Sequence, residues 1–251
     1  MKICIVGNKG SFLNDVVGEF IDNDISVSHC YSDDIVNGNI EKILDISEAS
    51  VLLYIGGETR FEDKMETHNF IIPKRLLNFC VESQLKFVYL STLSVFGWND
   101  NNLITIASQR QPYDYYGKTK NKFDAYRRNS GVSNFIALYP ASIDAGRGRS
   151  SVEKFSSLMS SCPILKVIKL PGCLSVVSRK DLIKKIVDSC LSSEKTGDQL
   201  VSSHKQLSDF SANISVAFPR LPGAFFRVIK YIAGAKKAML LKMLLQGVEY
   251  R

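Results

Sequence analysis

The chain has 251 residues and a formal net charge of +7, which is enough sequence for a large domain with a substantial core and a small companion domain. Hydrophobic residues make up 45% and charged residues 23% of the chain, which excludes an intrinsically disordered chain and a disulfide scaffold. Residues 220–251 hold seven basic side chains and one acidic one, so the other 219 residues carry a net charge of only +1. A nucleic-acid-binding domain needs a basic face rather than a basic end, so we predict no nucleic-acid partner.

The six cysteines form no CxxC pair, and the three histidines have no metal-ligand spacing, so no metal site is predicted. Most cysteines lie in apolar stretches, where buried and reduced thiols are expected. A cytoplasmic location fits this pattern. The first apolar run ends at Gly7, too early for a signal peptide, and no uncharged stretch reaches the roughly 18 residues of a membrane span.

In the first half of the chain, short runs of β-branched and other apolar residues alternate with segments whose apolar residues recur every three or four positions. The short runs predict buried strands at 2–6, 26–31, 50–56, 86–92 and 134–139. The periodic segments predict helices at 12–21, 62–83 and 114–129. This order predicts an α/β fold with a doubly wound parallel sheet, which binds ligands at the carboxyl ends of its strands. The connection over 31–50 is short, so one crossover helix is expected to be reduced.

After about residue 147 the alternation of strands and helices becomes less regular. The pattern predicts helices at 153–162, 179–193 and 207–218, and strands at 163–172 and 198–203. Prolines 219 and 222 then introduce apolar, basic final helices.

A glycine-containing loop, from Gly7 to Leu13, directly follows the first strand and opens the first helix. Glycines in this context let the backbone approach a pyrophosphate, which the helix N-terminus then holds. Leu13 occupies the third glycine position, and a loop of this kind also occurs for turn geometry alone. Asp33, after the second strand, is placed either to hold a ribose 2′-hydroxyl or to lie in a solvated turn.

Two further features lie near the same sheet edge. Thr92 ends the strand at 86–92, and Tyr116 has a lysine, Lys120, four residues later on the same helix face. A tyrosine exchanges protons near neutral pH only if a neighbouring cation stabilises its phenolate. Lys120 is placed to supply that charge.

In this order, the motifs resemble those of the extended short-chain dehydrogenase/reductase family of nucleotide-sugar epimerases, dehydratases and reductases. The resemblance covers nearly the whole chain. It rests on the segments 7–13, 69–80, 91–97, 116–120, 139–143, 175–186 and 197–214 and on the final helices. It implies a Rossmann-type NAD(P)-binding domain over 1–147 and a small C-terminal α/β substrate-binding domain over 148–251, which includes the basic helices.

The resemblance also implies roles for single residues. Thr92 would orient the substrate, Tyr116 would act as acid and base, and Lys120 would be its electrostatic partner. The cofactor would be NAD or NADP, in contact with Gly7, Lys9, Gly10, Ser11, Phe12, Leu13, Asp33, Asn39, Ile40, Gly56, Tyr116, Lys120 and Pro140. The expected contacts of the nucleotide-sugar substrate are Thr59, Arg60, Thr92, Ser142 and Arg147, although Thr59, Arg60 and Arg147 also fit solvated loops.

The residues after Thr92 narrow the set of expected reactions. In the 4,6-dehydratases of this family, Asp-Glu follows the threonine, whereas Leu93 and Ser94 follow it here, so dehydration is disfavoured. The cysteine and histidine of the C3 and C5 epimerases have no match. Reduction of a 4-keto sugar nucleotide and 4-epimerisation remain, and the short 31–50 connection favours the reductase slightly. Lys9 favours NADP and Asp33 favours NAD, so the cofactor stays open.

Two departures from the family pattern support an alternative. Leu13 replaces a glycine, and Leu174 stands where an arginine often meets the substrate pyrophosphate, so the chain could instead be a catalytically weak NAD(P)-binding sensor. The family also implies a homodimer through the helices at 63–83 and 114–129. Residues 220–251 either contact an anionic membrane peripherally or cap the small domain.

Overall fold

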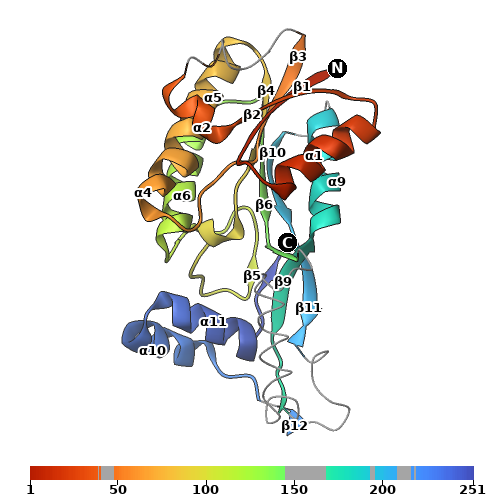
Figure 1. Ribbon diagram of the computed structural model, residues 1–251. Coiled ribbons are helices and arrows are strands. Elements are labelled where there is room, and N and C mark those ends of the chain that lie inside the picture. The colour runs from red at the N-terminus through yellow and green to blue at the C-terminus, as the bar shows by residue number, and fades with distance from the viewer. Residues whose placement is uncertain (39, 41–47, 145–167, 193–195, 208–215, 218) are drawn as a thin grey trace. The chain divides into compact units, whose positions relative to one another are not determined.

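A six-stranded sheet forms the centre of the first of two units in the computed structural model (Figure 1), which describes all residues except 39, 41–47, 145–167, 193–195, 208–215 and 218. This unit comprises residues 1–92, 115–139 and 183–199. Its strands, in spatial order, are β2 (Ser26–Tyr31), β1 (Lys2–Gly7), β3 (Ala49–Tyr54), β4 (Lys86–Leu90), β6 (Phe135–Pro140) and β10 (Gly197–Val201). The first five strands pair in parallel.

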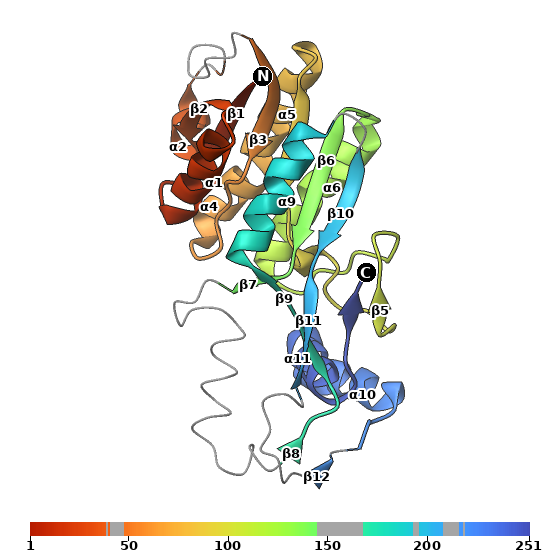
Figure 2. The same cartoon turned by 90° about the vertical axis from the view of Figure 1, so that its right-hand side faces the viewer.

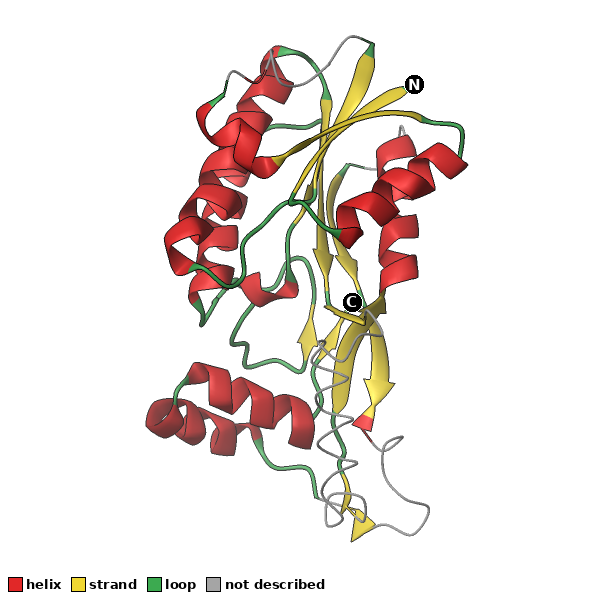
Figure 3. Cartoon of the chain, viewed as in Figure 1, coloured by secondary structure: helices red, strands yellow, loops and turns green. Residues whose placement is uncertain are grey.

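Helices cover both faces of this sheet, as Figure 3 shows by colour. One face carries α1 (Ser11–Asp22) and α9 (Arg179–Leu191); the other carries α2 (Ser32–Asn37), α4 (Glu62–Glu66), α5 (Ile72–Glu82) and α6 (Tyr115–Ser130). The residues of β1 from Ile3 to Val6 are fully buried, as expected of a parallel strand covered on both sides. In α1, Leu13, Val16 and Phe20 form the buried stripe of an amphipathic helix.

The strand order reverses at β1, which lies between β2 and β3. The chain moves from β1 outward to β2 and then crosses to β3 on the other side. This is the topological switch point at which doubly wound sheets bind ligands. The predicted α/β fold with a doubly wound parallel sheet is confirmed.

The structure refines two predicted helices and corrects a third. The helix predicted over 62–83 is interrupted by a π-helical turn, Thr67–Ile71, and the reduced crossover at 31–50 contains the six-residue α2. The helix predicted at 207–218 is wrong at its end, because Val216–Ala217 form strand β12, which pairs in parallel with β8 (Ile168–Lys169). Backbone pairing there overrides the helical periodicity. The helix predicted at 153–162 lies outside the described residues.

The second unit comprises residues 93–114, 140–182 and 200–251. Its three-stranded sheet has β9 (Cys173–Ser178) at the centre, with β11 (Ser203–Gln206) antiparallel and β7 (Ser142–Asp144) parallel to it (Figure 2). A 3₁₀ turn, Leu93–Val95, precedes β5 (Leu103–Ile104), which pairs with β13 (Glu249–Tyr250). The final helices, α10 (Gly223–Ala233) and α11 (Ala235–Leu245), form a hairpin.

The core of the second unit is an apolar cluster between β9 and the end of α11. Leu170, Leu174, Val176 and Leu207 are buried in it, and Met243, Leu244 and Leu245 pack against them. This burial explains the run of apolar residues at the end of α11. Among the described residues, no helix is long and apolar enough to cross a bilayer.

Candidate active site

The loop after β1 gives α1 an N-terminus suited to an anion. Gly10 is the N-cap residue, and α1 has neither a side-chain cap nor an acidic residue in its first turn. At Gly7, an added Cβ would lie 3.0 Å from Cγ1 of Ile55 and 3.3 Å from Cδ1 of Leu13, so the close packing of the end of β1 against these side chains favours glycine. A dinucleotide diphosphate therefore fits this loop.

The loop after β3 adjoins the glycine loop at the switch point. The Asn8 side chain donates a hydrogen bond to the Gly57 carbonyl oxygen. Gly56 is buried, and an added Cβ would lie 2.4 Å from Ser32 Oγ. Asn69, fully buried on the π-helical turn, accepts a hydrogen bond from the Glu58 N–H at 3.0 Å and donates one to its carbonyl oxygen at 2.9 Å. The Asn8 hydrogen bond joins the two loops, and the Asn69 hydrogen bonds fix the loop after β3 to the π-helical turn.

Helix α6 places Lys120 against the carboxyl ends of two strands. Its Nζ donates hydrogen bonds to the carbonyl oxygens of Leu90, at 3.0 Å, and Gly56, at 3.3 Å. Leu90 ends β4, and Thr92 follows two residues later. Tyr116 lies one turn before Lys120 on α6 and is half-buried, as is Thr92. The predicted catalytic residues are therefore carried by the end of β4 and by a helix bound to that end.

Lys120 is buried to 1% exposure, and its ammonium lies 4.8 Å from the ring centre of Tyr89. Burial lowers the pKa of Lys120 to about 7, because a charged amine loses its hydration, and the nearby Asp124 carboxylate opposes this shift. Near neutral pH both the charged and the neutral form of the lysine are therefore populated.

Thr119 connects α6 to the loops. Its hydroxyl accepts a hydrogen bond from Asn69 Nδ2 at 3.0 Å and donates one to the Tyr116 carbonyl oxygen at 2.9 Å. The chain of contacts from Glu58 through Asn69 and Thr119 therefore ends at the backbone of Tyr116.

At the end of β2, Asp33 lies in the first turn of α2 with its side chain 84% exposed. Its Oδ1 is 3.3 Å from Nε2 of the buried His68. Lys9 is exposed, with Nζ 5.8 Å from the ring centre of Tyr31, the last residue of β2. A carboxylate and an ammonium thus border the same edge, which keeps NAD and NADP equally open.

The remaining predicted contacts differ in exposure. Ser11 is exposed and Phe12 half-buried, whereas Leu13, Ile40 and Pro140 are buried. Thr59 and Arg60 are exposed, and their N–H groups are bound by Glu58 Oε1 at 2.7 and 2.6 Å. Asn39 and Arg147 lie outside the described residues.

The second unit holds a cavity of about 180 Å³ that includes one predicted substrate residue, Ser142. Its other lining residues are Leu93, Ser94, Gly97, Tyr113, Leu174, Ser175, Met243 and Tyr250. Leu174 also belongs to the apolar core, where α11 packs. An arginine at this position would lose its hydration inside that cluster, which gives a physical reason for leucine.

Sequence reasoning missed Glu58, Asn69 and Thr119 as positioning residues. Two signals were present: Glu58 follows two glycines directly after a strand, and Asn69 opens the helix segment that carries part of the family resemblance. A larger cavity of about 370 Å³ lies at the opposite end of the sheet, between Gln84 and Asn134, and contains none of the predicted site residues.

No family model matches this sequence. Among solved structures, the fold is similar to that of the Bordetella bronchiseptica enzyme WbmG in complex with NAD and UDP, with a TM-score of 0.65, 11% identity and coverage of 99% of this chain and 84% of that one. The chain has the fold of nucleotide-sugar epimerases and reductases. It is also similar to UDP-glucuronic acid 4-epimerase from Bacillus cereus in complex with NAD, with a TM-score of 0.65, 14% identity and coverage of 87% and 86%.

A third similar structure with this epimerase and reductase fold is a dTDP-4-dehydrorhamnose reductase from Clostridium acetobutylicum. Its TM-score is 0.64 at 19% identity, with 97% of this chain and 100% of that chain covered. At these identities the similarity concerns the fold, and it confirms the predicted resemblance to the extended short-chain dehydrogenases/reductases at that level.

Proposed function

We propose that this chain is an NAD(P)-dependent oxidoreductase that acts at C4 of a nucleotide sugar, as a 4-keto reductase or a 4-epimerase. The observation that carries the proposal is the bonding of Lys120 Nζ to the ends of β4 and β3. It places an amine, with a tyrosine one turn away, beside a glycine loop that fits a diphosphate. The NAD-bound UDP-glucuronic acid 4-epimerase and the dTDP-4-dehydrorhamnose reductase of the same fold support this chemistry.

In this proposal a bound nicotinamide supplies or accepts the hydride at C4. Tyr116 donates its phenolic proton to the C4 oxygen when a ketone is reduced, and it takes that proton back when an alcohol is oxidised. The Thr92 hydroxyl hydrogen-bonds to the same oxygen and orients it. The charged form of Lys120 stabilises the phenolate of Tyr116. A 4-epimerase uses the same proton transfer twice, in opposite directions.

We also propose that Gly7 to Leu13, Asp33 and Gly56 contact the cofactor, because they lie at the same edge of the sheet. We further propose that the enzyme is a homodimer, that it serves surface polysaccharide biosynthesis and that it works in the cytoplasm. The five cysteines of the described segments are buried and form no disulfide, which fits a reducing compartment.

The test is turnover of NADH or NADPH with UDP- and dTDP-linked 4-keto sugars, followed by absorbance of the reduced nicotinamide. The wild-type protein should turn over at least about a hundredfold faster than Tyr116→Phe, because the variant has no proton to donate. Equal rates for the two proteins would sink the proposal. A dinucleotide retained through purification would favour the epimerase over the reductase.

A second candidate function is a sensor that binds NAD(P) without turnover. The burial of Leu174 in an apolar core favours it, because the arginine expected at this position would be the cation that binds a substrate pyrophosphate. Dinucleotide binding without oxidation or reduction of any 4-keto sugar would identify this function.

A further inference from the structure

An apolar stripe faces solvent on α10, in the second unit. Phe225, Val228 and Ile232 follow the i, i+3, i+7 spacing of one helix face, and they are 40%, 55% and 73% exposed. Tyr231, beside them, is 94% exposed. Phe226, which points the other way, is fully buried. The helix thus has one face packed against the unit and a second apolar face without cover among the described residues.

Positive charge borders this stripe. Lys236 and Lys237 are exposed at the start of α11, directly after the turn at Gly234. Arg220, which precedes α10, is also exposed. No acidic residue occurs in the sequence between residues 219 and 248. The apolar stripe therefore lies in an entirely basic segment.

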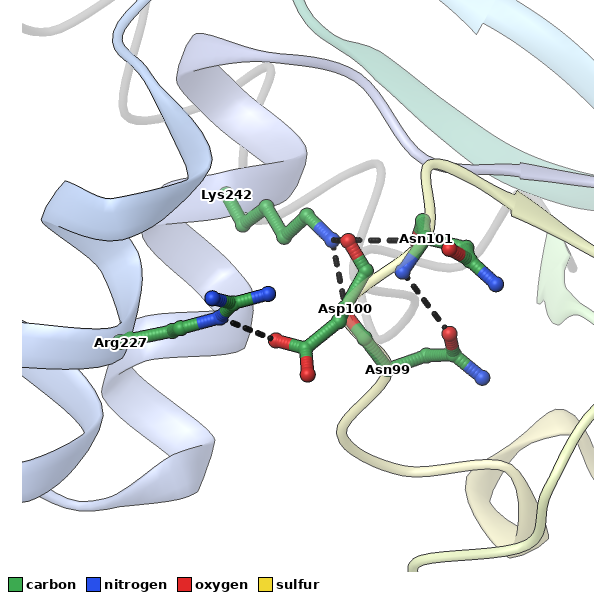
Figure 4. A network of polar contacts seen from close by, with 5 residues as sticks. All are labelled: Asn99, Asp100, Asn101, Arg227 and Lys242. Carbon is green, nitrogen blue, oxygen red and sulfur yellow. Dashed lines mark hydrogen bonds and ion pairs between the residues drawn. The ribbon is translucent and has the colours of Figure 1, made fainter.

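Polar contacts fix the hairpin to the loop that precedes β5, as Figure 4 shows. Lys242 is 1% exposed, and its Nζ donates to the carbonyl oxygens of Asn99, Asp100 and Asn101 at 2.8, 2.7 and 3.0 Å. Arg227 Nε pairs with Asp100 Oδ1 at 3.1 Å.

Lys230 adds an aromatic contact, since its Nζ lies 4.8 Å from the ring centre of Trp98. These contacts use the side of α10 that faces the unit. Because that side is held by buried and paired groups, the stripe of Phe225, Val228 and Ile232 cannot turn inward without breaking them.

We propose that the exposed stripe of α10, together with Lys236 and Lys237, docks on an anionic lipid surface. A bilayer accepts apolar side chains below its headgroups while lysines meet the phosphates. A second copy of this chain is a poorer occupant, because pairing the stripe with itself would bring two basic segments together. The surface goes beyond the proposed reaction and does not depend on it.

The experiment is co-sedimentation of the full chain with phosphatidylcholine vesicles, with and without phosphatidylglycerol, at low and high salt. The chain should bind the vesicles that contain phosphatidylglycerol, and high salt should release much of it. Binding to neither kind of vesicle, or equal binding to both, would overturn the proposal.

Two double variants separate the contribution of the lysines from that of the apolar stripe. Lys236→Glu with Lys237→Glu should lower the partition coefficient by about tenfold or more, whereas Lys180→Glu with Lys184→Glu, the same charge change at two exposed lysines of α9, should lower it far less. Val228→Ser with Ile232→Ser should also lower it by about tenfold. Ile21→Ser with Val81→Ser, at comparably exposed positions, is the matched control.

Measuring the molar mass in solution distinguishes lipid docking from pairing with a second copy of this chain. If Val228→Ser with Ile232→Ser halves the molar mass and leaves vesicle binding unchanged, the stripe is an interface between copies and the lipid proposal is wrong. Unchanged mass with lost vesicle binding supports it. Circular dichroism of each variant shows that it is folded.

Discussion

Lys120 joins three parts of the proposed site through one buried amine. Its hydrogen bonds reach the end of β4 and the loop after β3, and its ammonium lies over the Tyr89 ring. Burial of this kind disfavours the charged form, yet the proposed chemistry needs that form to stabilise a phenolate. Asp124, fully buried one turn further along α6, partly offsets the cost.

The titration of Lys120 predicts a pH dependence of stability. Burial lowers its pKa from 10.5 to about 7, so between these values the unfolded chain binds more protons at this residue than the folded chain. Its contribution to the free energy of unfolding therefore rises as the pH increases from about 7 to about 10. Lys120→Met should flatten that rise, as measured by urea unfolding at several pH values. An identical pH dependence in the variant would contradict this account.

Thr119 offers a second test at the scale of single residues. Thr119→Val keeps the shape of the side chain but removes the acceptor for Asn69 and the donor to Tyr116. We expect the free energy of unfolding to fall by about 1–3 kcal/mol, because the buried Asn69 amide is left without this partner. Thr119→Ser, which keeps the hydroxyl, should recover most of the loss in the same urea titration.

Among the elements, strand β3 is followed by a tightly packed glycine. Gly56 lies where an added Cβ would meet Ser32 Oγ at 2.4 Å and the Tyr54 ring at 2.7 Å. The Tyr54 ring cannot move easily, since it is fully buried and its hydroxyl donates to the His68 carbonyl oxygen at 2.6 Å. The close packing of β3 and α2 therefore depends on the absence of a side chain.

Two glycine-to-alanine variants should change the free energy of unfolding in opposite directions. Gly56→Ala should lower the free energy of unfolding by about 1–3 kcal/mol through overpacking. Gly18→Ala, in the middle of α1 with no atom within 4 Å of the added Cβ, should raise it by about 0.5–1 kcal/mol through helix propensity. Denaturant titration measures both, and a stabilising Gly56→Ala would refute the packing argument.

For the whole molecule, the proposed cofactor site links ligand binding to global stability. NADH or NADPH at a hundred times its dissociation constant should raise the free energy of unfolding by about 2.7 kcal/mol, because only the folded chain forms the loop at α1. Ser11→Glu should abolish most of this gain by repelling the diphosphate, while it leaves the free chain as stable or slightly more stable through the helix dipole. Ser11→Gln is the uncharged control, and an undiminished gain in Ser11→Glu would place the dinucleotide elsewhere.

The sequence alone determined most strands and helices of the sheet, since their signal is local: the apolar run at β1 and the Leu13, Val16 and Phe20 stripe of α1. Strand β2, predicted to be buried, is buried only at Cys30 because it lies at the edge of the sheet. The sequence also predicted that Tyr116 and Lys120 share one helix face, because they are four residues apart, and α6 carries both. It could not show that Lys120 binds Leu90 and Gly56, or that Asn69 reaches Thr119, fifty positions away.

Only the tertiary structure decided those contacts, and it also decided which face of α10 is buried. Periodicity shows that α10 is amphipathic but assigns no partner to either side. The paired Arg227 and the buried Lys242 hold one side against the loop at Asn99. The apolar stripe at Val228 and Ile232 therefore stays exposed, since burial depends on neighbours distant in sequence rather than on the order of residues within the helix.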